Sequence, residues 1–252
     1  MGKLDGKVAI ITGAARGLGL GIARAFVKEG AKVATIGRTL STLQEFEKEF
    51  TANGYDVLIV QGDISKREDV KRLIDATVKK WGTIDILVNN AAAYNIKTLI
   101  ETTDEDMGKI LGSAVYGSLY CMQESFPYLK EHGGKVINFG SLAGVYGLEG
   151  HTSYSIAKEG LLGLTRTAAL EWGKYNIQVN AVAPLAATEM WFNFERTQPA
   201  EVVKDFLKMI PAGHMGDAEK DVGRAVVFLA SEDSNWITSR TLFVDGGQGA
   251  TR

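Results

Sequence analysis

The stretch Thr12-Gly13-Ala14-Ala15-Arg16-Gly17-Leu18-Gly19 decides the fold of this chain of 252 residues. An apolar run over residues 7–12 precedes it, and residues 18–29 after it carry apolar side chains at helical spacing. Glycines allow a tight turn and a close approach of the backbone to a pyrophosphate, and a helix N-terminus offers free N–H groups to that anion. A glycine-rich turn alone is a weak signal, but the order strand, turn, helix predicts a dinucleotide site here.

The rest of the chain repeats this alternation of strands and helices. Further strands are expected at residues 31–37, 56–61, 84–89, 135–140, 177–183 and 241–244, and helices at about residues 40–52, 69–81, 104–130, 154–172 and 218–230. Strands rich in Val and Ile are typical of a sheet buried on both faces, and the alternation predicts parallel strands joined by right-handed crossovers. We therefore expect an α/β fold: a Rossmann-type, doubly wound, seven-stranded parallel sheet in three α/β/α layers.

Residues 1–252 are expected to form a single dinucleotide-binding domain, because no linker, repeat or low-complexity segment interrupts the pattern. Only the stretch at about residues 188–216 interrupts the alternation of strands and helices. It carries bulky side chains such as Trp191, Phe192 and Phe206. A bulky insertion after a sheet strand is where a lid over a substrate is expected.

The composition argues against several classes of protein. A formal net charge of −2 does not suit a nucleic-acid-binding protein, which is usually basic. Cys121 is the only cysteine, so no intramolecular disulfide can form, and His132 and His214 have no partners at metal-ligand spacing. No apolar run is long enough to span a bilayer and no apolar signal segment opens the chain. We expect a cytoplasmic protein without a metal, a membrane or a nucleic-acid partner.

The end of the second strand indicates which dinucleotide binds. A site that prefers NAD usually carries Asp or Glu there, which binds the ribose 2′-hydroxyl. This chain has Gly37 and then Arg38, and a guanidinium can bind a 2′-phosphate through two charge-assisted hydrogen bonds. Arg16 in the glycine-rich turn adds a second positive charge. The alternative is that both are ordinary solvated arginines; we expect NADP(H).

A second group of residues follows the fifth strand and carries proton-transfer chemistry. Ser141 comes first, and Tyr154 and Lys158 lie four residues apart, hence on one face of a helix. A phenol with a pKa near ~10 is a poor proton-transfer group at neutral pH, and a nearby ammonium is expected to lower that pKa. The three residues are predicted to be an oxygen anchor, a proton donor and its activator. A surface pair of helix residues is the alternative, which the glycine-rich turn and Ser141 make less plausible.

Taken together, these motifs resemble those of the short-chain dehydrogenase/reductase family, over nearly the whole chain. Asp63 after the third strand, Asn89-Asn90-Ala91 after the fourth and Asp245-Gly246-Gly247 near the end also fit that pattern. The resemblance implies Asp63 near the adenine, Asn89 near the ribose, and a homodimer or homotetramer. It also implies Tyr154 as the acid/base, Lys158 on the nicotinamide ribose and in the proton relay, and Thr188 near the carboxamide. The cofactor-binding residues so predicted are Gly13, Arg16, Gly17, Leu18, Gly19, Arg38, Asp63, Ile64, Asn90, Ala91, Tyr154, Lys158, Pro184 and Thr188.

Three departures from the family pattern fall around the predicted site. Ala92 stands where the family has Gly, which adds a methyl group beside the cofactor. Ala114 stands where the family has the Asn that supports a water in the proton relay, and Ser113 is adjacent but out of register. The Pro-Gly motif is one residue short in Pro184-Leu185-Ala186-Ala187-Thr188. Departures at one site within an intact scaffold suggest specialisation; the alternative, which we favour, is that neighbouring waters compensate and the ordinary chemistry of the family continues.

Three functions follow from this pattern. The favoured one is an NADPH-dependent carbonyl reductase, reversible as an alcohol dehydrogenase. A redox-neutral isomerase or cyclase that uses Tyr154 is the alternative, and intact Ser141, Tyr154 and Lys158 argue against a non-catalytic dinucleotide sensor. The predicted substrate pocket comprises Tyr94, Val145, Tyr146, His151, Leu185, Met190 and Trp191. This largely apolar and aromatic set indicates a small hydrophobic ketone or secondary alcohol, cyclic ones included.

Overall fold

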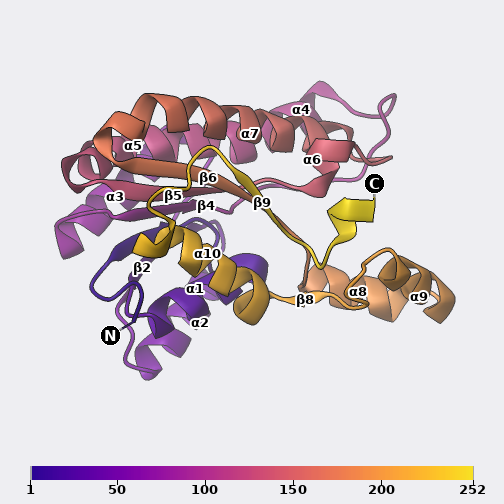
Figure 1. Cartoon of the computed structure of the whole chain (residues 1–252), viewed down its shortest axis with the longest axis horizontal. Coiled ribbons are helices and arrows are strands. Elements are labelled where there is room, and N and C mark those ends of the chain that lie inside the picture. Colours follow the sequence, from indigo (N-terminus) through magenta and orange to yellow (C-terminus); the bar gives the residue numbers. More distant parts are fainter. Residues whose placement is uncertain (1, 252) are drawn as a thin grey trace.

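Seven parallel strands build the central sheet of the protein, described here over residues 2–251 from a computed structural model. The strands are β1 (Val8–Ile11), β2 (Lys32–Gly37), β3 (Val57–Gln61), β4 (Ile86–Asn89), β5 (Gly134–Phe139), β6 (Ile177–Pro184) and β9 (Thr241–Val244). Their order across the sheet is β3-β2-β1-β4-β5-β6-β9, and every neighbouring pair is parallel. This confirms the predicted doubly wound Rossmann-type sheet (Figure 1).

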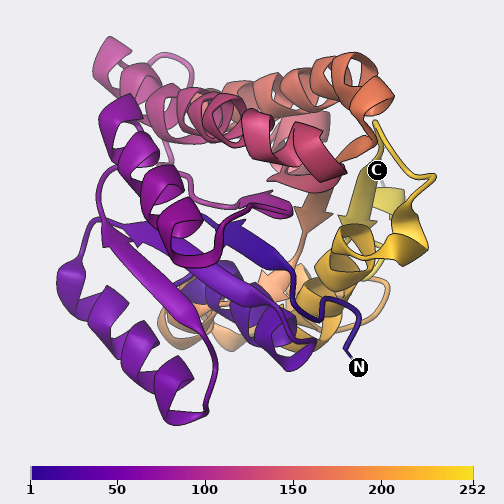
Figure 2. The same cartoon turned by 90° about the vertical axis from the view of Figure 1, so that its left-hand side faces the viewer.

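Helices cover both faces of this sheet. They are α1 (Gly17–Lys28), α2 (Leu40–Ala52), α3 (Arg67–Trp81), α4 (Asp104–Leu111), α5 (Gly117–His132), α6 (Leu142–Tyr146), α7 (Thr152–Trp172), α8 (Glu189–Thr197), α9 (Ala200–Lys208) and α10 (Arg224–Ala230). In Figure 2 the magenta and orange helices α5 and α7 lie on one side of the sheet and the indigo helix α1 on the other. Strands β1 and β4 are buried along their whole length, as their unbroken apolar runs predict.

Each face of the sheet has its own hydrophobic core. On one face, Ile22 and Phe26 of α1 pack with Val226 of α10 against the strands. On the other face, Leu73 of α3 and Leu129 of α5 pack against the opposite side chains of the same strands. Buried apolar area of this kind contributes most of the folding free energy, at roughly 25 cal/mol per Å². The two cores fix the carboxyl ends of β1, β4, β5 and β6 along one edge.

The helix expected at residues 104–130 is interrupted, which corrects the prediction of one continuous α-helix. α4 begins with a capping box between the Thr103 hydroxyl and the Asp106 carboxylate, each bonded to the other residue's main-chain N–H. A π turn over Gly112–Tyr116 then separates α4 from α5. Similarly, the helix expected at residues 218–230 opens with a π turn over Ala218–Gly223 before α10. Single π turns inside helices frequently lie at functional sites.

The stretch at residues 188–216 forms α8 and α9, which extend from the carboxyl edge of the sheet at the lower right of Figure 1. Two short strands, β7 (Ala186–Ala187) and β8 (Gly216–Asp217), pair in parallel where the chain leaves and re-enters the body. Inside this insertion the Trp191 ring packs against Phe194 and Phe206, with ring centres 5.6 and 5.4 Å apart.

Short 3₁₀ turns over Gly173–Tyr175, Glu232–Ser234 and Gln248–Thr251 complete the secondary structure. Across residues 2–251, none of the helices is both long and apolar enough to cross a membrane. The same residues contain no cluster of three or more His, Cys, Asp or Glu side chains that could hold a metal ion.

Candidate active site

A cleft of about 700 Å³ lies at the carboxyl edge of the sheet. The cleft is lined by the glycine-rich turn after β1, by the segments that follow β2, β3 and β4, and by the first residues of the insertion. Predicted cofactor residues on its surface are Gly13, Arg16, Gly17, Leu18, Gly19, Arg38, Asp63, Ile64, Asn90, Ala91 and Thr188. The cleft therefore gathers residues from distant parts of the sequence at the edge where doubly wound sheets bind ligands.

The glycine-rich turn has the shape that a bound pyrophosphate requires. Gly13 and Gly17 adopt φ angles of +67° and +56°, a region that residues with a side chain rarely adopt. A Cβ on Gly19 would lie 2.4 Å from the Gly13 carbonyl oxygen and 2.7 Å from Asn90 Nδ2. The backbone around Gly13, Gly17 and Gly19 thus forms a concave turn that only glycine permits, which we call the glycine cradle. The N-terminus of α1 faces this cradle.

Asn90 joins the ends of β1 and β4 beneath this turn. Its Nδ2 donates to the Thr12 carbonyl oxygen at 2.9 Å, and its main-chain N–H donates to Thr12 Oγ1 at 3.0 Å. Asn89, which the family resemblance implies near the ribose, is instead buried in the sheet and donates to Asn138 Oδ1 at 2.8 Å. The structure thus places Asn90, rather than Asn89, at the cleft.

The charges at the cleft suit a phosphorylated cofactor. Arg16 and Arg38 both line it and both side chains are exposed. Among the described residues neither guanidinium is paired with a carboxylate, unlike Arg24, which pairs with Glu49. Asp63 also lines the cleft, but its carboxylate accepts hydrogen bonds from the N–H and hydroxyl of Ser65. The glycine cradle and the two free guanidinium groups fit a dinucleotide with a further phosphate.

Ser141, Tyr154 and Lys158 lie together beyond the end of β5. Ser141 caps α6, where its hydroxyl accepts the Ala143 N–H at 3.1 Å. Lys158 Nζ donates to the Phe139 carbonyl oxygen at 2.6 Å and lies 5.5 Å from the centre of the Tyr154 ring. The end of β5 therefore holds both the serine and the lysine beside the phenol.

The electrostatics of this trio differ from the expectation that Lys158 lowers the pKa of Tyr154. Burial raises the pKa of Tyr154 to about 12, and a hydrogen bond with Ser141 opposes the rise only in part. Burial also lowers the pKa of Lys158 to about 8, because the residue is only 4% exposed and no carboxylate within residues 2–251 pairs with it. In the protein alone, Tyr154 is thus a protonated phenol at neutral pH.

The predicted substrate residues have different surroundings. Tyr94 and Met190 line the cleft, and the Tyr94 ring meets the Tyr154 ring edge-on at 5.1 Å. Val145 and Tyr146 are exposed on α6, and the Tyr146 hydroxyl donates to the Gly249 carbonyl oxygen at 2.9 Å. The chain end thereby contacts the helix that Ser141 caps.

Trp191, Leu185 and Pro184 do not reach the cleft. Trp191 is buried within the insertion, because its ring forms the centre of the aromatic cluster that joins α8 to α9. The main-chain N–H of Leu185 donates to the Val244 carbonyl oxygen at 2.9 Å, which ties this residue and Pro184 to β9. This packing places the Trp191 ring within the insertion, and its role in a substrate pocket stays a prediction.

Two of the three predicted departures from the family pattern, Ala92 and Ala114, have different surroundings. Ala92 lines the cleft, so its methyl group is at the surface that a cofactor would touch. Ala114 lies in the π turn, is 1% exposed and packs in an apolar cluster with Ile110 and Ala157. Ser113 accepts a hydrogen bond from the Ala93 N–H at 2.8 Å. The position of the missing asparagine is therefore filled by apolar packing.

One contact at the site has no local signal in the sequence. The Tyr94 hydroxyl lies 2.8 Å from His151 Nε2, which joins the loop after β4 to the turn before α7. The two residues are 57 positions apart, and only the fold brings them together.

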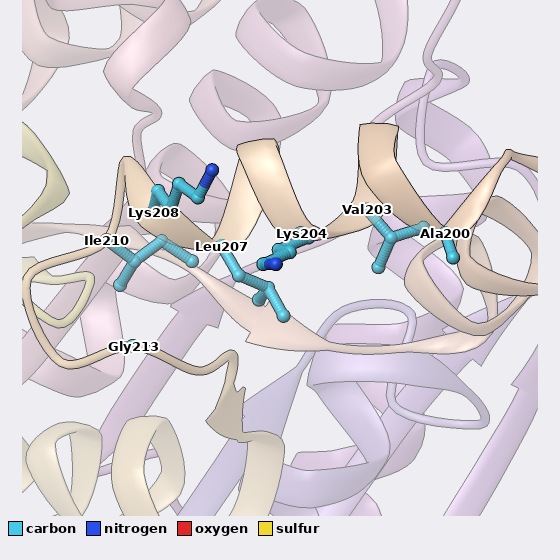
Figure 3. Close-up of a pocket in the computed structure, with 7 residues that line it drawn as sticks. All are labelled: Ala200, Val203, Lys204, Leu207, Lys208, Ile210 and Gly213. Carbon is cyan, nitrogen blue, oxygen red and sulfur yellow. The ribbon is translucent and has the colours of Figure 1, made fainter.

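A second hollow, of about 400 Å³, lies on α9 (Figure 3). Val203 and Leu207 form its apolar floor, and Lys204 and Lys208 also line it. None of the predicted site residues contributes to this hollow.

Comparisons with known proteins agree with the geometry. A family model described as "Enoyl-(Acyl carrier protein) reductase" matches residues 13–248. The chain is 42% identical to a 12alpha-hydroxysteroid dehydrogenase of Clostridium sp., with 99% of each chain covered. It is 35% identical to a 7alpha-hydroxysteroid dehydrogenase of Bacteroides fragilis, covering 98% of this chain and 96% of the relative.

Solved structures agree as well. Levodione reductase superposes with a TM-score of 0.92 at 28% identity, over 99% of this chain and 100% of the other. A structure from Sinorhizobium meliloti 1021 assigned to the short-chain alcohol dehydrogenases gives a TM-score of 0.91 at 33% identity, with 98% of each chain covered. The protein therefore belongs to the short-chain dehydrogenase/reductase family, and it is an oxidoreductase with a nicotinamide cofactor.

Proposed function

We propose that the protein is an NADP(H)-dependent oxidoreductase that interconverts a hydrophobic ketone, cyclic ones included, and its secondary alcohol. The observation that carries this proposal is the meeting of two features at one edge of the sheet. One is the Ser141, Tyr154 and Lys158 group, and the other is the glycine cradle with two unpaired arginines. The first suits proton transfer to an oxygen, and the second suits a phosphorylated dinucleotide.

The cofactor, when bound, supplies or accepts the hydride. In our proposal the N–H groups at the start of α1 hold its pyrophosphate, and Arg38 with Arg16 holds the 2′-phosphate. Thr188, on the cleft at the start of the insertion, contacts the carboxamide. α8 and α9 then act as the lid over the bound substrate.

The side chains supply the proton in the reduction direction. Ser141 donates a hydrogen bond to the substrate oxygen, and Tyr154 gives its proton to that oxygen as negative charge develops there. A phenol whose pKa is about 12 is protonated at neutral pH, so Tyr154 is in the form that reduction requires. Lys158, anchored on Phe139, holds the phenol in place and carries the positive charge that balances it in the reverse direction.

The mouth of the cleft supports a hydrophobic substrate. Large apolar side chains are exposed on the loop after β4, on α6 and on α8; they are Tyr94, Ile96, Val145, Tyr146, Met190 and Phe192. Of these, Tyr94 and Met190 line the cleft itself, and exposed apolar groups at a site indicate an apolar ligand. Because two relatives are named hydroxysteroid dehydrogenases, we propose a steroid ketone or hydroxysteroid as the substrate class.

Ala114 supports a second candidate, a redox-neutral isomerase or cyclase. Such an enzyme returns its proton to the same substrate and needs no relay to solvent. The apolar packing around Ala114, in place of the relay asparagine, suits that reaction.

The test follows NADPH absorbance and product mass together, with the purified protein and a panel of 7-oxo and 12-oxo steroids, cyclohexanone and an open-chain ketone. We expect one NADPH consumed for each alcohol formed, and the highest kcat/KM with a steroid. Product formed without consumption of NADPH would support the redox-neutral reaction and overturn the proposal.

A further inference from the structure

Tyr94 and His151 form a polar pair beside the catalytic phenol. The Tyr94 ring meets the Tyr154 ring edge-on, with centres 5.1 Å apart and planes at 85°. The His151 ring centre is 6.4 Å from that of Tyr154. Tyr94 is 40% exposed and lines the cleft, so its hydroxyl oxygen is accessible to a ligand there.

The direction of the hydrogen bond between the two residues follows from their neighbours. His151 Nδ1 lies 2.8 Å from the Glu149 carbonyl oxygen, which can only accept a hydrogen bond. Nδ1 therefore carries the proton of the neutral imidazole, and Nε2 is left as an acceptor. The Tyr94 hydroxyl, 2.8 Å away, must donate to Nε2. Its single proton is then engaged, and its oxygen can only accept from a third group.

The loop that carries Tyr94 is fixed on both sides, so this arrangement is pre-organised. Asn95 accepts a hydrogen bond from the Ser153 hydroxyl of α7 at 2.8 Å and donates to Asp106 of α4 at 3.0 Å. Lys97 Nζ pairs with the same Asp106 carboxylate at 2.7 Å. Bonds on both sides of the loop hold the Tyr94 oxygen in place before a ligand arrives, which reduces the entropic cost of binding.

We propose that Tyr94 and His151 are specificity-determining residues that select substrates with a second hydroxyl group on the ring system that bears the reacting carbon. This inference rests on the proposed function. A substrate hydroxyl donates to the Tyr94 oxygen and completes its hydrogen bonding. A substrate carbonyl or carboxylate at the same place faces the Tyr94 oxygen, which is also an acceptor. The substrate oxygen and the Tyr94 oxygen then lose their hydrogen bonds to water without replacement. The favoured substrates are therefore hydroxyketones and the diols that they form.

The test uses triplets of steroid ketones that are identical except at one second ring position, which is a hydroxyl, a methylene or a carbonyl. A net hydrogen bond is worth about 0.5–1.5 kcal/mol, so wild type is expected to prefer the hydroxyl over the methylene compound about two- to tenfold in kcat/KM. The carbonyl compound is expected to be the poorest of the three. Ratios within a triplet are not changed by a general loss of activity or stability.

Two variants separate hydrogen bonding from shape. Tyr94→Phe keeps the ring but removes the acceptor, so the preference for the hydroxyl over the methylene compound should be lost, and the methylene compound should bind at least as well as the other two. His151→Phe frees the Tyr94 proton, which a carbonyl oxygen can then accept, so the carbonyl compound should no longer be the poorest of the three. Tyr128→Phe on α5 is the matched control and should keep the wild-type ratios.

Unchanged ratios in Tyr94→Phe, or a carbonyl compound that stays the poorest of the three in His151→Phe, would overturn the proposal. Calorimetry with NADP⁺ present also gives the dissociation constants of the three compounds, and their ratios within a triplet are compared in the same way. If wild type reduces none of the ketones with NADPH, the proposed function fails, and the calorimetric ratios still decide whether the pair selects a hydroxyl group.

Discussion

Lys158 donates a 2.6 Å hydrogen bond from Nζ to the carbonyl oxygen of Phe139, two residues before Ser141. This bond fixes a lysine of α7 to the strand that presents the serine, across the same edge of the sheet. Because Lys158 is 4% exposed, its charge is held at a cost in stability. Burial of this charged ammonium therefore lowers the stability of the folded protein. Such destabilising burial is common where a protein positions a proton-transfer group.

Stability should depend on pH through Lys158 in a defined direction. Burial lowers its pKa from 10.5 to about 8, so between these values the unfolded chain binds a proton that the folded chain does not, and stability rises with pH. Below pH 8 the lysine is protonated in both states, so the folded protein bears the full free-energy cost of burying the charged ammonium. From pH 7 to pH 10, wild type should gain roughly 2–3 kcal/mol in free energy of unfolding relative to Lys158→Met.

Urea unfolding of both cofactor-free proteins at the two pH values measures this difference. Lys135, whose pKa is likewise lowered to about 8 by burial, is present in both proteins and cancels. A constant difference in free energy of unfolding between the proteins would show that the Lys158 pKa is not lowered.

Tyr154→Phe should abolish most of the turnover. The substitution keeps the ring and removes the proton, and groups that transfer a proton typically contribute about 10²–10⁴ in rate. Affinity for NADPH should stay nearly unchanged, since the pyrophosphate and 2′-phosphate contacts are elsewhere. Steady-state kinetics and calorimetry measure the two effects, with Tyr128→Phe as control. A variant that keeps most of its activity would mean that another group is the acid.

Arg38→Ala should remove the preference for NADPH. Loss of a charge-assisted, bidentate contact corresponds to roughly 1.5–3 kcal/mol, or about ten- to a hundredfold in NADPH affinity. NADH affinity should not change, because NADH has no 2′-phosphate. Calorimetry with both cofactors tests this, and Arg166→Ala on the outer face of α7 is the control. Equal affinities of the wild-type protein for NADPH and NADH would contradict the cofactor assignment.

Gly19→Ala should disrupt the cradle, whereas the same change at Gly163 should not. A Cβ at Gly19 meets the Gly13 carbonyl oxygen at 2.4 Å, but a Cβ at Gly163 in α7 meets no atom within 4 Å. Removal of a helical glycine in open space should stabilise the protein by about 0.5–1 kcal/mol. Thermal unfolding and NADPH binding measure both variants, and similar behaviour of the two would show that the tight turn is not required.

The sequence predicted the sheet well because its signals are local. The Val- and Ile-rich runs located all seven strands, and β9 and α2 have the predicted ends. The π turn at Gly112–Tyr116 was missed because a register change inside a helix has no side-chain pattern of its own.

The site was predicted less completely, for physical reasons. Residues with a fixed spacing, such as Tyr154 and Lys158, were identified. The burial that raises the Tyr154 pKa depends on packing from several elements, so its direction was predicted wrongly. Trp191 was assigned to the pocket because a bulky side chain beside a cleft suits either a ligand or its own neighbours, and only the positions of Phe194 and Phe206 decide between them.

The most direct test of the proposed reaction is the transfer of deuterium from NADPH labelled at C4 of the nicotinamide. The purified protein is incubated with a steroid ketone and each stereoisomer of the labelled cofactor, and the product is analysed by mass spectrometry and NMR. We predict that one of the two isomers gives an alcohol with a single deuterium on the new carbinol carbon, and that Tyr154→Phe slows its formation. A product that carries no deuterium from either isomer would contradict hydride transfer and with it the proposed function.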